Sequence, residues 1–585
     1  MSANAGLLID GLIVLVYFIG IVSVGIYVGR RETSLHEFAL GGRRVPWWAV
    51  MASIIAAETS AATFIGVPVE GYNSLSLAYV QMVFGLILGR VLVGYIILKP
   101  YYRYKVYTVY DYLAIRFGTA SKNYVSALFL IMRTLASGTR LFVPSLVIVL
   151  AWQIFFQGQE SVQFSVRTIE TVWPYFWAVL GITAITFVYT ALGGIKAVIW
   201  TDVIQATLMF GSAIIATLTL LYHIGGDSWN LIEGFRAVAA EVPQMTQISG
   251  YVRTGFEEQA VSNWMETRQI TEMTIWEYVK LILFSDYTLF SVLIGGTMGN
   301  MASFGTDQDM VQRLLTAETY KKSRRSLVTA AFMDIPIFAI FTFIGVLLFV
   351  YYKQDPTFKP HDSADVFGSY ILNVMPTGIR GLVLAGIFAT TMGSLSAALN
   401  ALATSATNDW YLPRSRRSHD EAHQVAAARF FTFVFALLMI GIAVVFAYAK
   451  INTPELRIIP VVLGVANFIL GPMLGVFLLG MLTRARGSDK GNMIAITCGL
   501  VVTILAGGLH VTLLELIGKD WAITHYLHDL QQNYVKVSFT WFGVVGTVTV
   551  ILVGLLFRTP EAVLRNAERH AAAADAGDER PVHLR

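Results

Sequence analysis

The sequence predicts an all-α integral membrane protein, and three observations lead to this prediction. Of the 585 residues, 55% are apolar and only 14% are charged. The mean hydropathy is +0.61, whereas a soluble protein of this length needs more charge to cover its surface. Apolar runs also follow one another along almost the whole chain, and each is long enough to form a spanning helix, which needs about 20 apolar residues.

Thirteen segments have this length and composition, and each is apolar on nearly all sides, as a helix inside a membrane protein is. They cover residues 7–29, 46–70, 76–98, 123–152, 172–192, 197–223, 284–306, 326–351, 379–407, 428–449, 457–482, 491–513 and 537–557. We therefore expect one transmembrane domain over residues 1–558 and a tail over 559–585. The end from Ala567 to Arg585 is rich in alanine and charge, which predicts a disordered tail or a frayed helix.

Lysine and arginine residues indicate how the chain is oriented. They gather in alternate connections, around residues 30–44, 103–116, 313–325, 414–417 and 484–490, and again from Arg558 onward. The segment 224–280 on the opposite side is rich in glutamate instead. Because cytoplasmic loops carry the excess of positive charge, we expect a plasma or inner membrane protein with its N-terminus outside and its C-terminus in the cytoplasm.

Two of the expected spans contain residues that interrupt a helix. Residues 57–66 read Ala-Glu-Thr-Ser-Ala-Ala-Thr-Phe-Ile-Gly, with Pro68 after them, and residues 295–300 read Gly-Gly-Thr-Met-Gly-Asn. Carbonyl oxygens freed at such a break can bind a cation where they line a cavity. The breaks lie five spans apart, as expected if residues 46–223 and 284–482 form inverted repeats.

Polar groups inside the expected spans have both a structural and a functional interpretation. Ionisable residues within a bilayer are usually functional unless they pair with one another; those found here are Glu58, Glu70, Arg90, Arg133, Arg140, Asp202 and Asp334. Lys196 and Arg313 lie near inner ends and can extend towards water. The ninth span is rich in small and hydroxyl residues, which serve either close helix packing or sodium binding.

Several motifs in the right order give the sequence a family resemblance. They lie at residues 38–48, 107–118, 193–205, 307–313, 394–400 and 471–480. With them the chain, from about residue 7 to 557, resembles the sodium:solute symporter family. The resemblance implies the LeuT-type fold, with 13 transmembrane helices: two inverted repeats of five core helices, one helix before them and two after. It also implies alternating access driven by a transported sodium ion, which is not a permanent cofactor.

The resemblance implies a sodium site on the first, fifth and eighth core helices. The matching positions are Ala56, Thr59, Asp202, Thr390, Gly393 and Ser394. Backbone oxygens of the first helix and hydroxyl groups of the eighth bind the ion in the family, with a carboxylate nearby. Gly393 departs from the pattern, because family members have serine or threonine there. This departure leaves proton coupling open as an alternative.

The resemblance also implies a solute cavity beside the two broken helices. Thr63, Asn300 and Ser303 match a glutamine, an asparagine and the stacking aromatic of the sodium/galactose members, and Gln81 is expected to face the same cavity. Loss of the glutamine and the aromatic argues against a pyranose. Glu58 can pair with Arg140, bind a cationic solute group or carry a proton. If Arg140 is free instead, it can anchor a carboxylate.

The function expected from these observations is sodium-coupled symport of a small polar solute, with a preference for a carboxylate-bearing metabolite. A sugar or polyol substrate and an ion channel remain alternatives. An enzyme is not expected, because the 10 histidines are scattered without HExxH spacing or a Ser/His/Asp arrangement, and no phosphate-binding loop suggests an ATP-driven pump. The expected partners are membrane lipid, the solute and sodium, with no nucleic acid and no obligate protein partner.

Overall fold

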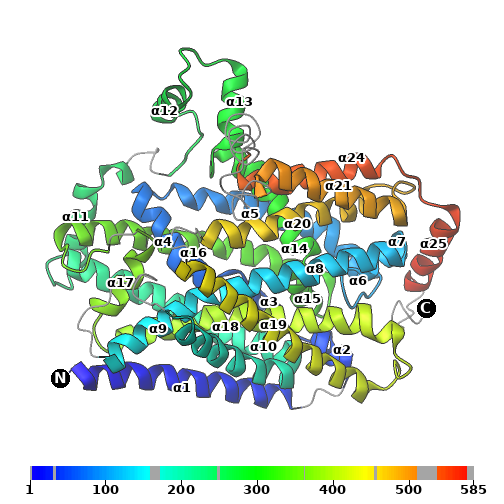
Figure 1. Ribbon diagram of the computed structural model, residues 1–585, viewed down its shortest axis with the longest axis horizontal. Coiled ribbons are helices and arrows are strands. Elements are labelled where there is room, and N and C mark those ends of the chain that lie inside the picture. The colour runs from blue at the N-terminus through cyan, green and yellow to red at the C-terminus, as the bar shows by residue number, and fades with distance from the viewer. Residues whose placement is uncertain are drawn as a thin grey trace. The chain divides into compact units, whose positions relative to one another are not determined.

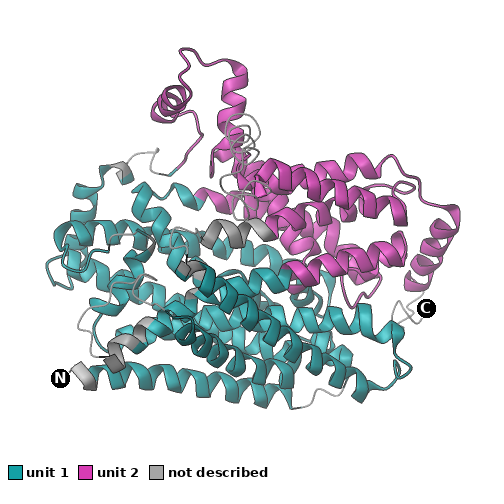
Figure 2. Ribbon diagram, viewed as in Figure 1, with its two compact units in different colours: residues 1–80, 133–251, 312–462 teal, residues 81–132, 252–311, 463–585 magenta. Residues whose placement is uncertain are grey.

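The computed structural model describes residues 3–30, 34–157, 171–246, 251–360, 363–452, 458–509 and 537–575 (Figure 1). Within these ranges the chain is helical, with no strand and only two isolated bridges, Val45 with Ala317 and Arg486 with Arg558. The described chain divides into two compact units (Figure 2). Unit 1 holds residues 1–80, 133–251 and 312–462, and unit 2 holds residues 81–132, 252–311 and 463–585.

Unit 1 contains long helices joined by short ones. They are α1 (Ala3–Gly29), α2 (Leu35–Leu40), α3 (Trp47–Glu58), α4 (Ala61–Ser74), α9 (Phe142–Gln157), α10 (Trp173–Ile224), α11 (Leu231–Glu241), α16 (Tyr320–Gln354), α17 (Val366–Asn373), α18 (Ile379–Ser405) and α19 (Glu421–Asn452). Short 3-10 or π segments are η1 (Gly41–Arg43), η5 (Pro243–Thr246), η8 (Ser363–Asp365), η9 (Ala406–Tyr411) and η10 (Leu412–Arg414).

Unit 2 contains the remaining helices. They are α5 (Met82–Leu92), η3 (Val93–Ile97), α6 (Leu98–Arg103), α7 (Asp111–Arg116), α12 (Glu258–Arg268), α13 (Ile275–Phe284), η7 (Ser291–Gly296), α14 (Thr297–Thr306), α21 (Asp489–Gly507), η12 (Phe539–Trp541), α24 (Phe542–Gly554) and α25 (Glu561–Asp575). Four elements contain residues of both units: η2 (Ala78–Gln81), α8 (Thr119–Arg140), α15 (Gln308–Leu315) and α20 (Ile458–Leu482).

The expected break in the second span is confirmed. Helix α3 ends at Thr59, whose backbone is extended (φ −82°, ψ 97°). Ser60 then starts α4, because its hydroxyl accepts a hydrogen bond from the Thr63 N–H and so caps the new helix. The axes before and after the break differ by 64°. The chain therefore leaves backbone groups free of the helical ladder at this point.

The seventh span differs in detail from the expectation. Residues 291–296 form the π-helical turn η7, which continues without a gap into α14. The helix ends only at Asp307, whose backbone is extended (φ −82°, ψ 118°). The glycines at 295 and 296 thus widen the helix rather than unwind it, and the interruption comes after Thr306 instead.

The two spans expected at 172–192 and 197–223 form the two parts of α10, which meet at a kink. Only Gly194 leaves helical geometry, with φ 50° and ψ −152°, a conformation that residues with a side chain avoid. Beside it, a Cβ on Gly29 would lie 2.1 Å from the Gly193 Cα. The glycine pair therefore both bends α10 and lets α1 approach it closely.

The described residues contain eight helices long and apolar enough to cross a membrane, and nine if α3 and α4 count as one bent span. The described parts of the spans expected at 457–482 and 537–557 form shorter apolar helices. The total of thirteen therefore stays a prediction.

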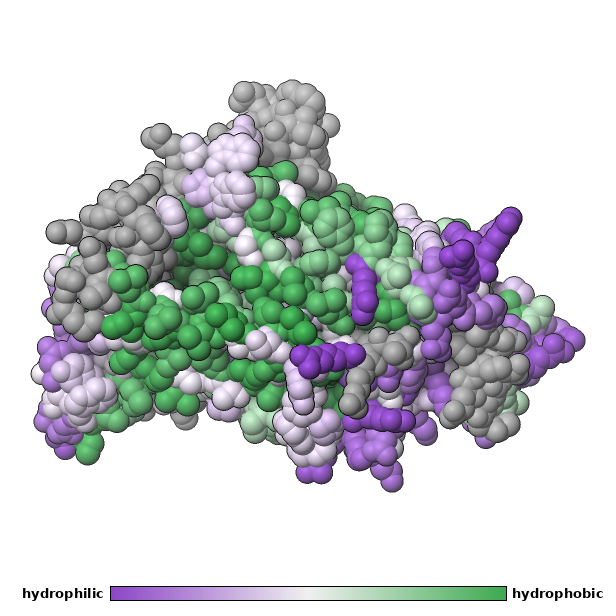
Figure 3. Space-filling view, turned by 90° about the horizontal axis from the view of Figure 1, so that it is seen from below, coloured by the Kyte–Doolittle hydropathy of each residue, from purple (hydrophilic) through white to green (hydrophobic). Residues whose placement is uncertain are grey.

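Helix α1 carries many exposed apolar side chains. They point outward, with Leu8 74% and Leu12 60% exposed. Figure 3 shows one face of the molecule on which apolar residues cover a broad area and hydrophilic residues gather towards the ends. Such an apolar surface suits lipid rather than water.

The tail is more ordered than the disordered alternative that we expected. Residues 561–575 form α25, and Arg103 Nη2 lies 2.6 Å from Asp575 Oδ2. Alanine has the highest helix propensity of all residues, which accounts for the helix without an apolar face. Residues 576–585 lie outside the described part of the chain.

Candidate functional site

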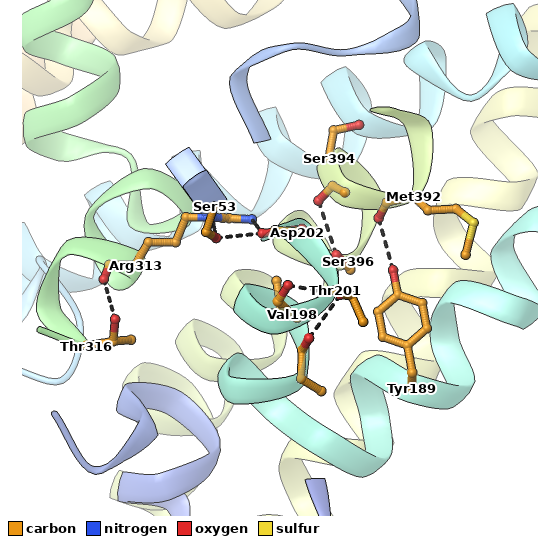
Figure 4. Close-up of polar contacts among 12 residues, drawn as sticks. Ser53, Tyr189, Val198, Thr201, Asp202, Arg313, Thr316, Met392, Ser394 and Ser396 are labelled. Atoms are coloured by element: carbon orange, nitrogen blue, oxygen red, sulfur yellow. Dashed lines mark hydrogen bonds and ion pairs between the residues drawn. The ribbon is translucent and has the colours of Figure 1, made fainter. Parts of the chain in front are cut away.

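A buried charge network joins α3, α10 and α15 through residues of unit 1 (Figure 4). Arg313 Nη2 donates to Asp202 Oδ2 at 3.0 Å, and Arg313 Nε donates to Ser53 Oγ at 2.8 Å. Ser53 Oγ in turn donates to the same carboxylate oxygen at 2.6 Å. The side chains of Asp202 and Arg313 have no exposed surface. Two opposite charges buried this deeply persist only when they are paired and hydrogen-bonded.

Only one of the two Asp202 carboxylate oxygens has hydrogen-bond partners in this network. Asp202 Oδ1 is buried and has no hydrogen-bond partner among the described residues, and the same holds for Gln205 Oε1 one helical turn along α10. A buried oxygen without a partner costs free energy. In native proteins such an atom marks a place for a ligand, ion or water.

Gly393 on α18 lies against this unsatisfied side. A Cβ placed on Gly393 would lie 2.8 Å from Gln205 Oε1 and 3.4 Å from both Asp202 Oδ1 and the Ala56 carbonyl oxygen. Three oxygen atoms from α10 and α3 thus surround one small volume beside the Gly393 backbone. Oxygen ligands of this kind suit a hard cation.

The other predicted sodium-site residues lie on the same elements. Thr59 is buried at the end of α3, and Thr390 is buried on α18. The Thr390 hydroxyl donates to the Ile387 carbonyl at 2.8 Å, and the Ser394 hydroxyl donates to the Thr391 carbonyl at 3.0 Å. Each hydroxyl donates its hydrogen within α18, so its lone pairs remain to accept or coordinate.

Other polar residues of α18 serve packing, the alternative left open by the sequence. Gln312 Nε2 donates to Asn400 Oδ1 at 2.7 Å, to Thr404 Oγ1 at 3.1 Å and to the Ala39 carbonyl at 2.7 Å. The polar face of α18 therefore has two parts. One part packs against α15, and the part around Gly393 lies beside the unpartnered oxygens.

A polar pocket opens next to the break between α3 and α4. The described residues that line it are Ser60, Ala61, Ser137, Arg140, Leu141, Thr391, Ser394 and Leu395. Arg140 is the only charged residue of this lining, so the pocket presents positive charge together with hydroxyl groups. This is the chemistry that binds an anion.

The predicted solute contacts fall into two groups. Glu58, Thr63 and Arg140 belong to unit 1, where Glu58 is half-buried at the last position of α3. Gln81, Asn300 and Ser303 belong to unit 2. Arg140 is the one that the pocket brings beside the predicted sodium ligand Ser394. The predicted pair of Glu58 with Arg140 stays a prediction.

In unit 2 two of the predicted solute contacts make hydrogen bonds within the protein. Arg90 Nε donates to Asn300 Oδ1 at 3.4 Å, and the Arg90 guanidinium lies 4.2 Å from the Phe304 ring centre. Gln81 accepts from the Arg253 N–H at 3.0 Å and donates to the carbonyls of Arg253 and Tyr287. These bonds tie Gln81 to the segment that precedes α14.

Sequence reasoning missed three residues of this site. Arg313 was expected to extend towards water, but it is fully buried because Asp202 and Ser53 hold it. The Asp-Gln-Asp-Met-Val-Gln-Arg motif at 307–313 was the signal that could have indicated it. Gln205 ends the motif at 193–205 and had the same kind of signal. Ser53 carried none, since one polar residue in an apolar run is most often a packing residue.

The chain matches a known protein family over most of its length. The model of the sodium:solute symporter family matches residues 38–499. The sodium/sialic acid symporter of Proteus mirabilis is 26% identical over 552 residues, which cover 92% of either chain. The sodium/glucose cotransporter of Vibrio parahaemolyticus is 25% identical and covers 84% of either chain.

A solved Na⁺-coupled sialic acid symporter, substrate-bound and outward-open, shows the fold. It superimposes with a TM-score of 0.66 and 24% identity, and the match covers 94% of this chain and 97% of that one. The family match extends over most of the chain and includes α3, α10 and α18, which carry the unpartnered oxygens. The chain therefore belongs to the sodium:solute symporter family and is a multi-pass membrane transporter that couples solute uptake to sodium.

Proposed function

We propose that this symporter carries a small solute with a carboxylate group, and that the carboxylate binds Arg140 in the pocket beside the break between α3 and α4. The observation that carries the proposal is the lining of that pocket. Among its described lining residues the only charged one is an arginine, and the other polar ones carry hydroxyl groups. A guanidinium binds a carboxylate through two parallel hydrogen bonds, which give both affinity and orientation.

The relatives support an acidic solute without naming it. The sialic acid symporters, whose name denotes an acid, are 26% and 27% identical to this chain over 92% of its length. The glucose cotransporter is the counterexample. A glucose-like solute is the second candidate, and it would use hydroxyl groups of the pocket rather than the charge of Arg140. Thr63, Gln81, Asn300 and Ser303 stay predicted solute contacts.

For the sodium ion we propose a site between α3, α10 and α18. Its ligands are the backbone oxygens of Ala56 and Thr59, the hydroxyls of Thr390 and Ser394, and the nearby carboxylate of Asp202, with Gly393 beside them. The end of α3 at Thr59 supports this assignment, because the last carbonyls of a helix lack ladder partners. The unpartnered Asp202 Oδ1 supports it as well.

Sodium binding and solute binding are coupled because both sites use residues of α18. Ser394 and Thr391 line the solute pocket, and Ser394 is also a proposed sodium ligand on the same helix. A sodium ion that holds α18 against the end of α3 therefore stabilises the arrangement that binds the solute. Each ligand then raises the affinity of the other by the same factor.

We also propose the LeuT-type arrangement of 13 helices, with inverted repeats over residues 46–223 and 284–482. The 64° bend between α3 and α4 and the non-helical Gly194 inside α10 support it. The clusters of lysine and arginine support an outside N-terminus and a cytoplasmic tail over residues 559–585, in a plasma or inner membrane.

The test is uptake into proteoliposomes under an imposed sodium gradient. Labelled sialic acid and pyruvate represent the acids, and glucose represents the neutral solute. We expect sodium-dependent uptake of at least one acid. In Arg140→Gln its half-saturation concentration should rise about 10- to 100-fold, because a hydrogen-bonded charge is lost. Arg140→Lys keeps the charge without the planar fork and should fall in between.

The control is the methyl ester of the same acid. It should be a poor substrate of the wild type and should be affected little by Arg140→Gln. Uptake of glucose but neither acid, with unchanged kinetics in Arg140→Gln, would overturn the carboxylate proposal and favour the sugar candidate. Equal uptake in sodium and in choline would contradict the proposed sodium site.

A further inference from the structure

Building on the proposed sodium site, we infer that Gln205 supplies the oxygen ligand that Gly393 lacks. The Gln205 side-chain carbonyl, Asp202 Oδ1 and the Ala56 carbonyl together bind the transported sodium ion. A hydroxyl on α18 is thereby replaced by an amide oxygen on α10, and glycine at 393 leaves the space that the amide needs.

The first argument is that two of these oxygens are buried without a partner. Asp202 has no exposed surface and Gln205 is 1% exposed. Within the described part of the chain, Asp202 Oδ1 and Gln205 Oε1 accept no hydrogen bond. Two adjacent acceptors that face one space cannot satisfy each other, because neither has a hydrogen to donate. A cation satisfies both at once.

The second argument is the orientation of the Gln205 amide. Its Nε2 donates to Tyr17 Oη on α1 at 3.4 Å. Tyr17 Oη donates its own hydrogen to Met392 Sδ, 3.7 Å away, which leaves its lone pairs to accept from the Gln205 N–H. Tyr17 therefore holds the nitrogen on the far side and leaves Oε1 facing Gly393.

The third argument is the close approach at Gly393. A Cβ there would lie 2.8 Å from Gln205 Oε1, closer than carbon and oxygen pack without a shift. Serine at this position would therefore displace the amide from the space that it shares with Asp202 Oδ1 and Ala56. The amide oxygen of Gln205 thus takes the place of the hydroxyl that Gly393 lacks.

The fourth argument is charge. Arg313 and Ser53 occupy Asp202 Oδ2 and leave Oδ1 for the ion. The ion then contacts one partly neutralised carboxylate and two neutral carbonyls. Because these ligands attract it only weakly, a transported monovalent cation can be released. Arg313 and Ser53 act through Asp202 and are positioning residues.

The test is the sodium half-saturation concentration of purified protein, measured by thermal shift in sodium against choline at constant ionic strength. We expect Gln205→Ala and Gly393→Ser each to raise it about 10-fold, the effect of one lost ligand. In the double variant G393S/Q205A the new hydroxyl can enter the vacated space. We expect its half-saturation to return to within about 3-fold of the wild type.

The matched control is G393A/Q205A, which relieves the same crowding without adding an oxygen. Equal recovery with alanine and serine would show that the contact is only packing, and would overturn the inference. Gln205→Met keeps the side-chain volume and removes the carbonyl, so it replaces Gln205→Ala if that variant does not fold.

The inference and the proposed sodium coupling fail in different ways. An unchanged half-saturation in Gln205→Met, in protein that still responds to sodium, would reject Gln205 as a ligand and leave sodium coupling intact. A wild type that shows no thermal shift with sodium and no sodium-dependent uptake would contradict the proposed sodium site itself.

Discussion

Two buried aspartates show how structural and functional carboxylates differ in this protein. Asp111 in unit 2 receives Lys122 Nζ on Oδ1 at 2.7 Å and the N–H groups of Tyr107 and Thr108 on Oδ2 at 3.0 and 3.1 Å. Asp202 in unit 1 receives Arg313 and Ser53 on Oδ2 alone. Both residues are at most 4% exposed, so burial does not distinguish them.

The difference lies in the second oxygen. Asp111 is hydrogen-bonded through both oxygens, and it thereby fixes the turn between α6 and α7. Burial would raise the pKa of Asp111, but the Lys122 charge and the two N–H groups outweigh it and hold the pKa below its usual value. Asp202 leaves Oδ1 unpartnered beside Gly393. A fully bonded carboxylate stabilises the fold, and a half-bonded one is ready to bind a ligand.

The largest effect expected from this comparison is a loss of stability in Asp111→Asn. The change removes the charge that pairs with Lys122, which is 7% exposed. Breaking such a pair costs about 3–5 kcal/mol. We expect a marked fall in melting temperature and a low yield in detergent, measured by thermal unfolding. Protein that does fold should keep the wild-type sodium half-saturation, and a changed half-saturation would contradict the purely structural role.

A loss of stability and a large loss of sodium binding are expected in Asp202→Asn; the stability falls because the buried Arg313 loses its charge partner. The asparagine carbonyl can still accept from Arg313 and Ser53, so the variant should fold. The ion loses its one charged ligand, and its half-saturation concentration should rise about 100-fold, or about 2.7 kcal/mol. Sodium titration of the purified variant measures this. Half-saturation within 3-fold of the wild type would place Asp202 with Asp111 as a structural carboxylate.

Features that depend on residues close together in the chain can be predicted from the sequence, and contacts between distant segments cannot. The interruption at Thr59 and Ser60 follows from local composition, and the structure places it as expected. The candidate Asp202 follows from a motif and stays a prediction as a sodium ligand. Arg313 is different. Its place near a span end suggested contact with water, and only the pairing of α15 with α10 buries it.

Gln205 could not be predicted as a ligand for the same reason. Its role depends on which end of the amide faces Gly393, and Tyr17 decides this from a helix 188 positions away in the chain. The π-turn at residues 291–296 also depends on packing, because adjacent glycines permit an unwound segment or a widened helix equally well. Patterns in one segment do not contain such information.

The smallest loss of stability is expected at a third carboxylate, Asp575. It tests whether burial or distance determines how strongly an ion pair stabilises the protein. Asp575 Oδ2 lies 2.6 Å from Arg103 Nη2, closer than Asp111 lies to Lys122. Its pKa is lowered by the hydrogen bond from Arg103. However, the two side chains are 60% and 45% exposed, so water and salt screen the pair.

We expect Asp575→Ala to change the melting temperature by about 1 °C at most. Thermal unfolding beside Asp111→Asn measures this. A fall comparable to that of Asp111→Asn would mean that α25 contributes to the stability of unit 2, and that distance rather than burial determines the strength of these pairs.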